Sequence, residues 1–214
     1  MKPENFNIVS AFIGALVAIL LKVLFDRIST SIKLNRLRKI VLEYSISIGL
    51  DKSSQYIKDM NHISGYIMAY SDDEIKKYAE MNYGVDAMPM FTSDIFRSFS
   101  QDELRRISYN SLNYIILLDI SYSIDFLKEY LALELYDKYY IKVRKHFEDD
   151  GISVKDEAKH FEECGYLKSL AESAVNEIKM KIKRAEETHH QIHVIIGALS
   201  GYDLIWTLKY FIKQ

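Results

Sequence analysis

The sequence predicts an all-α protein, an antiparallel helical bundle anchored in a membrane by an N-terminal and a C-terminal transmembrane helix. Three observations support this fold class. An apolar run lies near each end of the chain, and the charged middle repeats apolar residues at helical spacing. The 214 residues also contain only two prolines and eight glycines, the residues that most often interrupt helices. We expect a transmembrane helix over 7–26, a cytosolic helical bundle over 27–190 and a second transmembrane helix over 191–212.

The first apolar run extends from Ile8 to Phe25 and carries one charge, Lys22. At ~1.5 Å per residue it covers about 27 Å, close to the hydrocarbon core of about 30 Å. A signal peptide would place its basic residues before the run and a small-residue cleavage site after it. Here the basic residues follow the run, which places the N-terminus outside and the body in the cytoplasm. We expect five of them to set topology and contact anionic headgroups: Arg27, Lys33, Arg36, Arg38 and Lys39.

The second apolar run, Ile192–Ile212, contains the charged residues Asp203 and Lys209. Each central charge costs about 2.5–3.5 kcal/mol on insertion, while Trp206 and Tyr210 are candidate interface anchors. Basic residues precede the run and mirror the first segment, which predicts that both termini lie outside the membrane. The alternatives are a buried core helix and an interfacial helix lying flat. The basic residues expected to contact headgroups here are Lys179, Lys181, Lys183 and Arg184.

Both apolar runs carry small residues four positions apart. Such a stripe lets two helix backbones approach closely in lipid. We therefore expect the two runs to pack together, or to pair across the subunits of a homo-oligomer. The stripe residues are Ser10, Gly14 and Ala18 in the first run and Gly197 and Gly201 in the second.

The first half of the middle segment continues in helical period from the first run. Apolar stripes over 34–48 and 56–70 predict a long amphipathic stalk with a kink near Gly49–Asp51. A capping box at Ser71–Glu74 predicts a short helix, and Thr92 or Ser93 is expected to start another that ends near Phe99.

A second capping box, Ser100–Glu103, opens the longest helical pattern, which we expect to run to about Phe147 and to end at Glu148–Gly151. Within it, Leu112–Leu127 is very apolar but contains Asp119 and Asp125, which makes it a buried central helix rather than a third crossing. Ser153 is predicted to cap the last cytosolic helix, which leads toward the second apolar run.

Asp203 is the first candidate for a functional role, in a pore or its gating. An ionisable group within a membrane helix usually faces a bundle interior or a water path. The alternative is an aspartate that is protonated or hydrogen-bonded to Thr207 or a neighbouring helix, or exposed because the segment never inserts.

No catalytic, cofactor or metal site is predicted. The sequence lacks phosphate-binding, dinucleotide-binding and metalloprotease motifs. His189, His190 and His193 have metal-ligand spacing without further ligands, so we interpret them as interfacial histidines. Cys164 and His160 are one helical turn apart, a spacing that is usually coincidental. A net charge of −2 gives no pull toward nucleic acid, and a lone cysteine excludes an internal disulfide.

The layout of two apolar ends, Ile8–Phe25 and Ile192–Ile212, around a helical middle resembles the small two-transmembrane effectors of bacterial anti-phage systems, including those encoded beside retron reverse transcriptases. This resemblance implies a toxin-like protein that a protein partner, for which a nucleoprotein complex is one candidate, holds inactive until infection. Once released, it would permeabilise the inner membrane. The alternatives are a non-enzymatic membrane anchor or scaffold that recruits a soluble partner, and, last, an enzyme with a non-obvious site.

Overall fold

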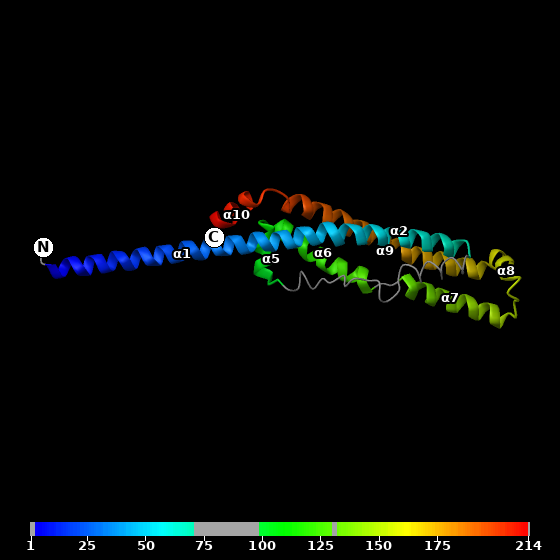
Figure 1. Cartoon of the computed structure of the whole chain (residues 1–214). Helices are drawn as coiled ribbons and strands as arrows, with labels where there is room; N and C mark the ends of the chain where they lie inside the picture. The colour runs from blue at the N-terminus through cyan, green and yellow to red at the C-terminus, as the bar shows by residue number, and fades with distance from the viewer. Residues whose placement is uncertain (1–2, 71–98, 130–131, 214) are drawn as a thin grey trace.

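The computed structural model describes residues 3–70, 99–129 and 132–213, and every regular element in these ranges is a helix. The predicted all-α class is therefore confirmed. The chain begins with one long rod in which α1 (Pro3–Tyr44), a π-helical segment (Ser45–Leu50) and α2 (Asp51–Met68) follow one another without a break (Figure 1). The short helices predicted to start at Ser71 and at Thr92 or Ser93 lie outside the described residues.

The π-helical segment stands where the sequence predicts a kink. Gly49, within it, faces α9 so closely that a Cβ atom would lie 3.2 Å from Ile192 Cδ1. A π-helical turn adds a residue to an α-helix without ending it. The irregularity that glycine permits is thus local, and the rod continues into α2.

The second half of the chain begins with three helices, α5 (Gln101–Ser108), α6 (Ser111–Glu129) and α7 (Ala132–Asp149). The predicted capping box is confirmed, because the hydroxyl of Ser100 accepts from Glu103 N while Ser100 N donates to the Glu103 carboxylate. The prediction of one helix to Phe147 is wrong. Tyr109 adopts a left-handed φ of 61° that ends α5, and the Asn110 side chain accepts from Asn113 N at the start of α6.

The chain then turns at Gly151, whose φ of +64° closes α7 as the sequence predicts. After α8 (Glu157–Glu163) comes the long helix α9 (Gly165–Leu199), followed by α10 (Asp203–Ile212). Ser153 does not cap a helix directly; its hydroxyl donates to the carboxylate of Asp156, which is the N-cap residue of α8.

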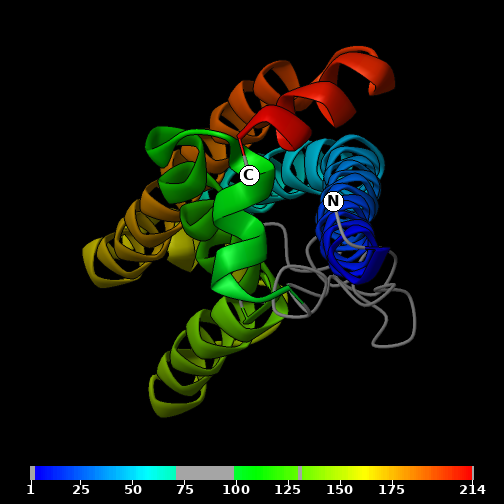
Figure 2. The same cartoon turned by 90° about the vertical axis from the view of Figure 1, so that its left-hand side faces the viewer.

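Two apolar clusters hold the body together, and α9 contributes to both. The distal core joins α2, α7, α8 and α9, with Met60, Ile63, Phe147, Leu167 and Ile178 among its members. The proximal core, named for its position beside the exposed part of α1, joins α1, α5, α6, α9 and α10. Figure 2 looks along the rod and shows these helices grouped around it.

We predicted that Leu112–Leu127 forms a buried central helix, and one face of α6 is buried in this way. Leu117 and Ile120 are buried in the proximal core, while Leu112 and Ile115 are exposed. Gln191 of α9 donates a hydrogen bond to Asp119. The side chain of Asp125 lies outside the described residues.

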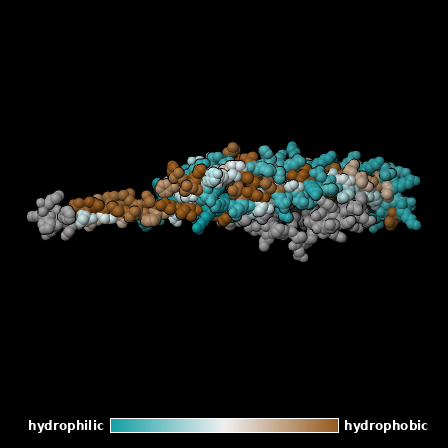
Figure 3. Space-filling model, turned by 45° about the horizontal axis from the view of Figure 1, so that its top comes forward, coloured by the Kyte–Doolittle hydropathy of each residue, from teal (hydrophilic) through white to brown (hydrophobic). Residues whose placement is uncertain are grey.

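The N-terminal part of α1 stands alone. Residues 9–29, the exposed rod, touch no core, and Figure 3 shows them as an apolar extension from a largely polar body. Among the described residues, one helix, running from Val9 to Met68, is long and apolar enough to cross a membrane.

Candidate functional site

The second apolar run does not form one helix. Helix α9 ends at Leu199 and α10 begins at Asp203, with Ser200–Tyr202 between them. Gly201, at φ +125°, adopts a conformation that L side chains rarely reach. The ten residues of α10 cover about 15 Å, half the thickness of a hydrocarbon core. The predicted single helix over 191–212 is therefore wrong, and a second crossing is not confirmed.

Helix α10 instead folds against α1 and α5 at the base of the exposed rod (Figure 1). Its two large aromatic residues, predicted as membrane-interface anchors, are buried in the proximal core. Trp206 Nε1 donates to Ser200 O at 3.0 Å, and Tyr210 Oη donates to Ile107 O at 2.8 Å. Burial of the Tyr210 hydroxyl raises its pKa well above the ordinary range. Both aromatic side chains anchor α10 to protein.

A buried arginine joins α10 to α1. Arg38 is 1% exposed, and its Nη2 donates to Asp203 Oδ1 at 2.9 Å. Its Nε donates to Asn35 Oδ1 at 2.9 Å, and its Nη1 donates to Leu199 O. A buried guanidinium is tolerated only when its donors are satisfied. Arg38 therefore ties the end of α9 and the start of α10 to one point on α1.

Two further contacts complete this arrangement. The Arg38 guanidinium carbon lies 5.2 Å from the centroid of the Trp206 ring, a cation–π distance. Lys39 Nζ lies 2.5 Å from Asp203 Oδ2. We call Arg38, Lys39 and Asp203 the latch. Hydrogen bonding from Lys39, together with the charges of Lys39 and Arg38, holds the pKa of Asp203 below its ordinary value.

The structure therefore gives Asp203 a different setting from the predicted pore. Its side chain is 51% exposed and has two cations of α1 as partners. It is also the first residue of α10, where a negative charge is favoured by the helix dipole.

The outer face of α10 is apolar and uncovered by the described residues. Leu204 is 81% exposed, and Ile205, Leu208 and Ile212 are also exposed. The helix is therefore amphipathic, with the aromatic face directed into the protein and the aliphatic face directed away from it.

A cavity of about 600 Å³ lies between α10, α1 and the α5–α6 corner. Its described lining includes the cations Arg27, Arg105, Arg106 and Lys213 and no acidic residue. Lys213 Nζ donates to the backbone carbonyl oxygen of Tyr109 and lies 4.0 Å from the centroid of the Tyr109 side-chain ring. The cavity is therefore a basic pocket at the base of the exposed rod.

The structure gives the predicted headgroup-contacting residues of α1 different surroundings. Arg27 lines the basic pocket and Arg36 is exposed, while Lys33 pairs with Glu103 of α5 at 2.6 Å. Arg38 is a correction, because its guanidinium is buried in the latch and cannot reach a headgroup. Lys39 is half-exposed and pairs with Asp203.

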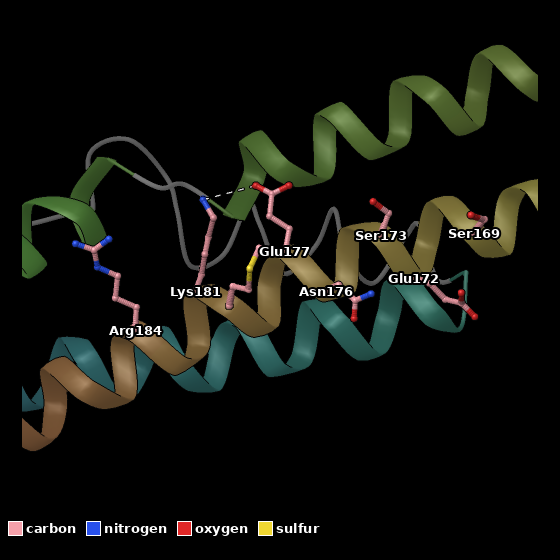
Figure 4. Close-up of a pocket in the computed structure, with 8 residues that line it drawn as sticks. Ser169, Glu172, Ser173, Asn176, Glu177, Lys181 and Arg184 are labelled. Atoms are coloured by element: carbon pink, nitrogen blue, oxygen red, sulfur yellow. Dashed lines mark ion pairs between the residues drawn. The ribbon is translucent and has the colours of Figure 1, made fainter.

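The predicted headgroup-contacting residues of α9 lie beside the distal core, and their contact with headgroups stays a prediction. Arg184 lies 15 residues before the end of α9 at Leu199, which is about 22 Å along a helix. Figure 4 shows Lys181 and Arg184 on the flank of α9, in an open polar groove of about 860 Å³. There Lys181 pairs with Glu177 at 3.8 Å. Lys179 and Lys183 are exposed on the same stretch.

The small-residue stripes are not packed against each other within the chain. Gly14 and Gly197 have open space where a Cβ would stand, and Ser10 and Ala18 lie on the exposed rod. Gly201 is outside any helix and serves the turn before α10.

Of the three histidines near the end of α9, His190 and His193 are exposed, while His189 is partly buried against α2. His189 Nδ1 is 2.8 Å from Ser53 Oγ of α2, and burial lowers its pKa, with a smaller contribution from His193. These contacts place His189 in the α2–α9 packing rather than at an interface.

Sequence reasoning missed the half of the basic pocket that comes from α5 and the C-terminus. Arg105, Arg106 and Tyr109 were hidden inside the single helix expected from Ser100 to Phe147. Arg105 and Arg106 lie in the last turn of α5, just before it ends at Tyr109. Had the helix been predicted to end there, two adjacent arginines at its C-terminal end would have indicated a basic site. No protein-family model, curated protein or solved structure matches this chain.

Proposed function

We propose that the chain is a membrane-anchored effector whose C-terminal helix is held by the latch and perturbs the bacterial inner membrane when released. In this proposal the exposed rod crosses the membrane and the helical body lies in the cytoplasm. A trigger acting on the body opens the latch. Helix α10 then turns about Ser200–Tyr202 and lays its apolar face into the headgroup region.

The anchoring part is supported by the exposed rod. The side chains of residues 9–25 are apolar apart from Ser10 and Lys22, and none of them belongs to a core cluster, an exposure that is unfavourable in water but favourable in lipid. Asp26 and Arg27 follow at the base of the exposed rod. The positive-inside rule places this base in the cytoplasm.

The position of α10 supports its action on the membrane surface. It lies beside the base of the rod, and the basic pocket there can attract anionic headgroups. Amphipathic helices of this kind bind with the apolar face about 5–10 Å into the headgroup boundary. Leu204, Ile205, Leu208 and Ile212 supply such a face.

The latch is the observation that carries the proposal. A buried arginine that is bonded at once to α1, to the end of α9 and to the start of α10 fixes a helix whose outer apolar face is not covered by the described residues. Loss of the Arg38 side chain removes its hydrogen bonds to Asn35, Leu199 and Asp203 at once and leaves its buried site empty. The latch can therefore hold α10 in one position and release it as a unit.

The test uses Arg38→Ala in the full chain, with Arg36→Ala as the matched control on the exposed side of the same helix. We expect Arg38→Ala to depolarise expressing cells and to release dye from vesicles containing anionic lipid, and Arg36→Ala to behave as the wild type. An Arg38→Ala protein that is folded and membrane-bound but never causes leakage would contradict the proposal.

The layout resemblance suggests phage defence as the biological setting. The second membrane crossing is not confirmed, so the resemblance to these effectors now rests only on the exposed rod and the helical body. Infection of cells that carry or lack the gene tests it directly.

A non-enzymatic anchor or scaffold is the second candidate function, and the polar groove on α9 favours it. Ser169, Asn176 and Glu177 are among the polar side chains that line this groove over several turns (Figure 4). Stable recovery of a soluble partner with the membrane-bound protein, without leakage from either Arg38 variant, would support the scaffold over the effector.

A further inference from the structure

The corner formed by α7, α8 and the start of α9 lies at the end of the body opposite the exposed rod (Figure 1). It carries a cluster of metal-ligand side chains. His146 comes from the last turn of α7 and Asp150 from the turn that follows. His160 lies in α8, and Cys164 occupies the corner between α8 and α9. The reversal of the chain between α7 and α9 therefore brings imidazole, thiol and carboxylate groups together.

The donor atoms converge on one point. His146 Nε2 lies 3.4 Å from His160 Nε2 and 3.5 Å from Cys164 Sγ, and the three donor atoms all lie within 4.8 Å of one another. Asp150 Oδ2 lies 3.3 Å from His146 Nε2 and 3.9 Å from His160 Nε2. Zinc bonds of about 2.0–2.3 Å in a tetrahedron separate neighbouring ligands by roughly 3.3–3.7 Å. The observed separations have this scale.

Hydrogen bonds alone do not account for this convergence. His146 Nε2 has three polar neighbours, yet one ring nitrogen carries either one proton or one in-plane lone pair and so makes one good hydrogen bond. A metal ion between the four groups satisfies all of them at once, with both imidazoles neutral and the thiol deprotonated.

The surroundings suit a closed site. The four groups are neither fully buried nor fully open, and the aromatic rings of Phe147 and Tyr166 lie against the two histidines. Each pair, His146 with Asp150 and His160 with Cys164, is spaced by four residues, so both partners project from one side of the chain. A part-buried ion pair between Arg144 of α7 and Glu157 of α8 joins the same two helices.

We propose that His146, His160 and Cys164 bind a zinc ion, with Asp150 as the fourth ligand. A thiolate with two imidazoles favours zinc over magnesium or calcium, which prefer oxygen ligands. Four protein ligands leave no open position, which makes the ion structural rather than catalytic. It would fasten the α7–α8–α9 corner, and binding would release the Cys164 proton.

The test starts with the unmodified full-length protein in detergent. After dialysis to remove loose metal, we expect about one zinc ion per chain by elemental analysis, as for a structural site. Cobalt added to metal-free protein should give the intense sulfur-to-cobalt charge-transfer band. A chelator should lower the melting temperature, and zinc should restore it.

Variants then assign the ligands. Cys164→Ser and His146→Ala should each lose the zinc, and Cys164→Ser should also lose the cobalt band, while His190→Ala, which removes an exposed imidazole elsewhere on α9, should keep both. Circular dichroism confirms that the variants remain helical. The proposal is overturned if the wild-type protein retains no zinc and gives no cobalt band, or if its zinc content is unchanged in Cys164→Ser and His146→Ala.

Discussion

The two apolar ends of the chain look alike in sequence and differ completely in the structure. The first run is one uninterrupted helix whose side chains from Val9 to Phe25 are exposed, while the second is divided between the end of α9 and α10. In the second run Ile192, Ile195 and Leu199 are buried in the proximal core. Hydropathy alone counts apolar residues. It does not register whether a protein core is available to cover them.

Three residues account for the difference. Gly201 allows a turn that ends α9, Asp203 finds cationic partners on α1, and Trp206 fits into the proximal core. The first run has no such residues; its one internal charge, Lys22, lies near the end that approaches the body. A turn glycine, a paired aspartate and a buried tryptophan together separate a segment that folds onto protein from one that does not.

The largest expected effect comes from placing charges in each run. Leu16→Arg with Leu20→Arg puts two charges in the exposed rod, at about 2.5–3.5 kcal/mol each for insertion. We expect the protein to leave the membrane fraction after carbonate extraction. The matched pair Leu204→Arg with Leu208→Arg on the exposed face of α10 should stay membrane-bound. Equal loss in both would mean that the two runs anchor the chain alike.

Trp206→Ala should have the next largest effect, because it removes the buried indole ring that holds α10 in the proximal core. Truncation of a buried tryptophan typically costs about 3–5 kcal/mol. We expect faster amide hydrogen exchange throughout 203–212 and a lower melting temperature. Leu208→Ala, on the uncovered face of the same helix, is the control and should leave both nearly unchanged. A Trp206→Ala protein with unaltered exchange in α10 would show that the helix is held elsewhere.

Glycine substitutions compare the two small residues of the second run. Gly201→Ala forces a side chain into a φ of +125° and toward Trp206 Nε1, 3.2 Å away, and should cost about 1–3 kcal/mol. Gly197→Ala adds a methyl in open space within α9 and should stabilise by about 0.5–1 kcal/mol. Denaturant titration measures both. Equal destabilisation by both substitutions would support the original prediction that Gly197 and Gly201 both pack against another helix.

The smallest effect concerns acid. The folded-state pKa of Asp203 is lowered, so its contribution is fully present above the ordinary aspartate pKa of ~3.9 and is lost as pH falls through the lowered value. Trp206 is the only tryptophan, so its fluorescence reports the docking of α10 directly. We expect an acid transition that is absent in Asp203→Asn. A transition of the same midpoint in that variant would assign it to another group.

Much of the fold follows from local signals in the sequence. The capping box at Ser100, the end of α7 at Gly151 and the irregular segment at Gly49 were all predictable, because each depends on residues close together in the chain. The break at Tyr109 was not, because a tyrosine in left-handed conformation has no sequence signature.

The candidate sites were harder to predict, because they depend on distant residues. Arg38 and Asp203 form the latch only when α9 returns along α1, and His146 meets Cys164 only through the reversal at α8. The His160–Cys164 spacing was visible in the sequence and was interpreted as coincidental. The third side chain of this cluster, His146, comes from another helix, α7.

The continuity of α1 into α2 has a mechanical consequence. From Phe25 to Met68 the rod is about 65 Å long at ~1.5 Å per residue. Transmembrane helices tilt by about 20° on average, and the tilt adjusts to bilayer thickness. If the rod is anchored as proposed, such a tilt moves its far end sideways by roughly 20 Å. The chain would then act as a lever, in which a small change in lipid thickness becomes a large sweep at the cytoplasmic tip.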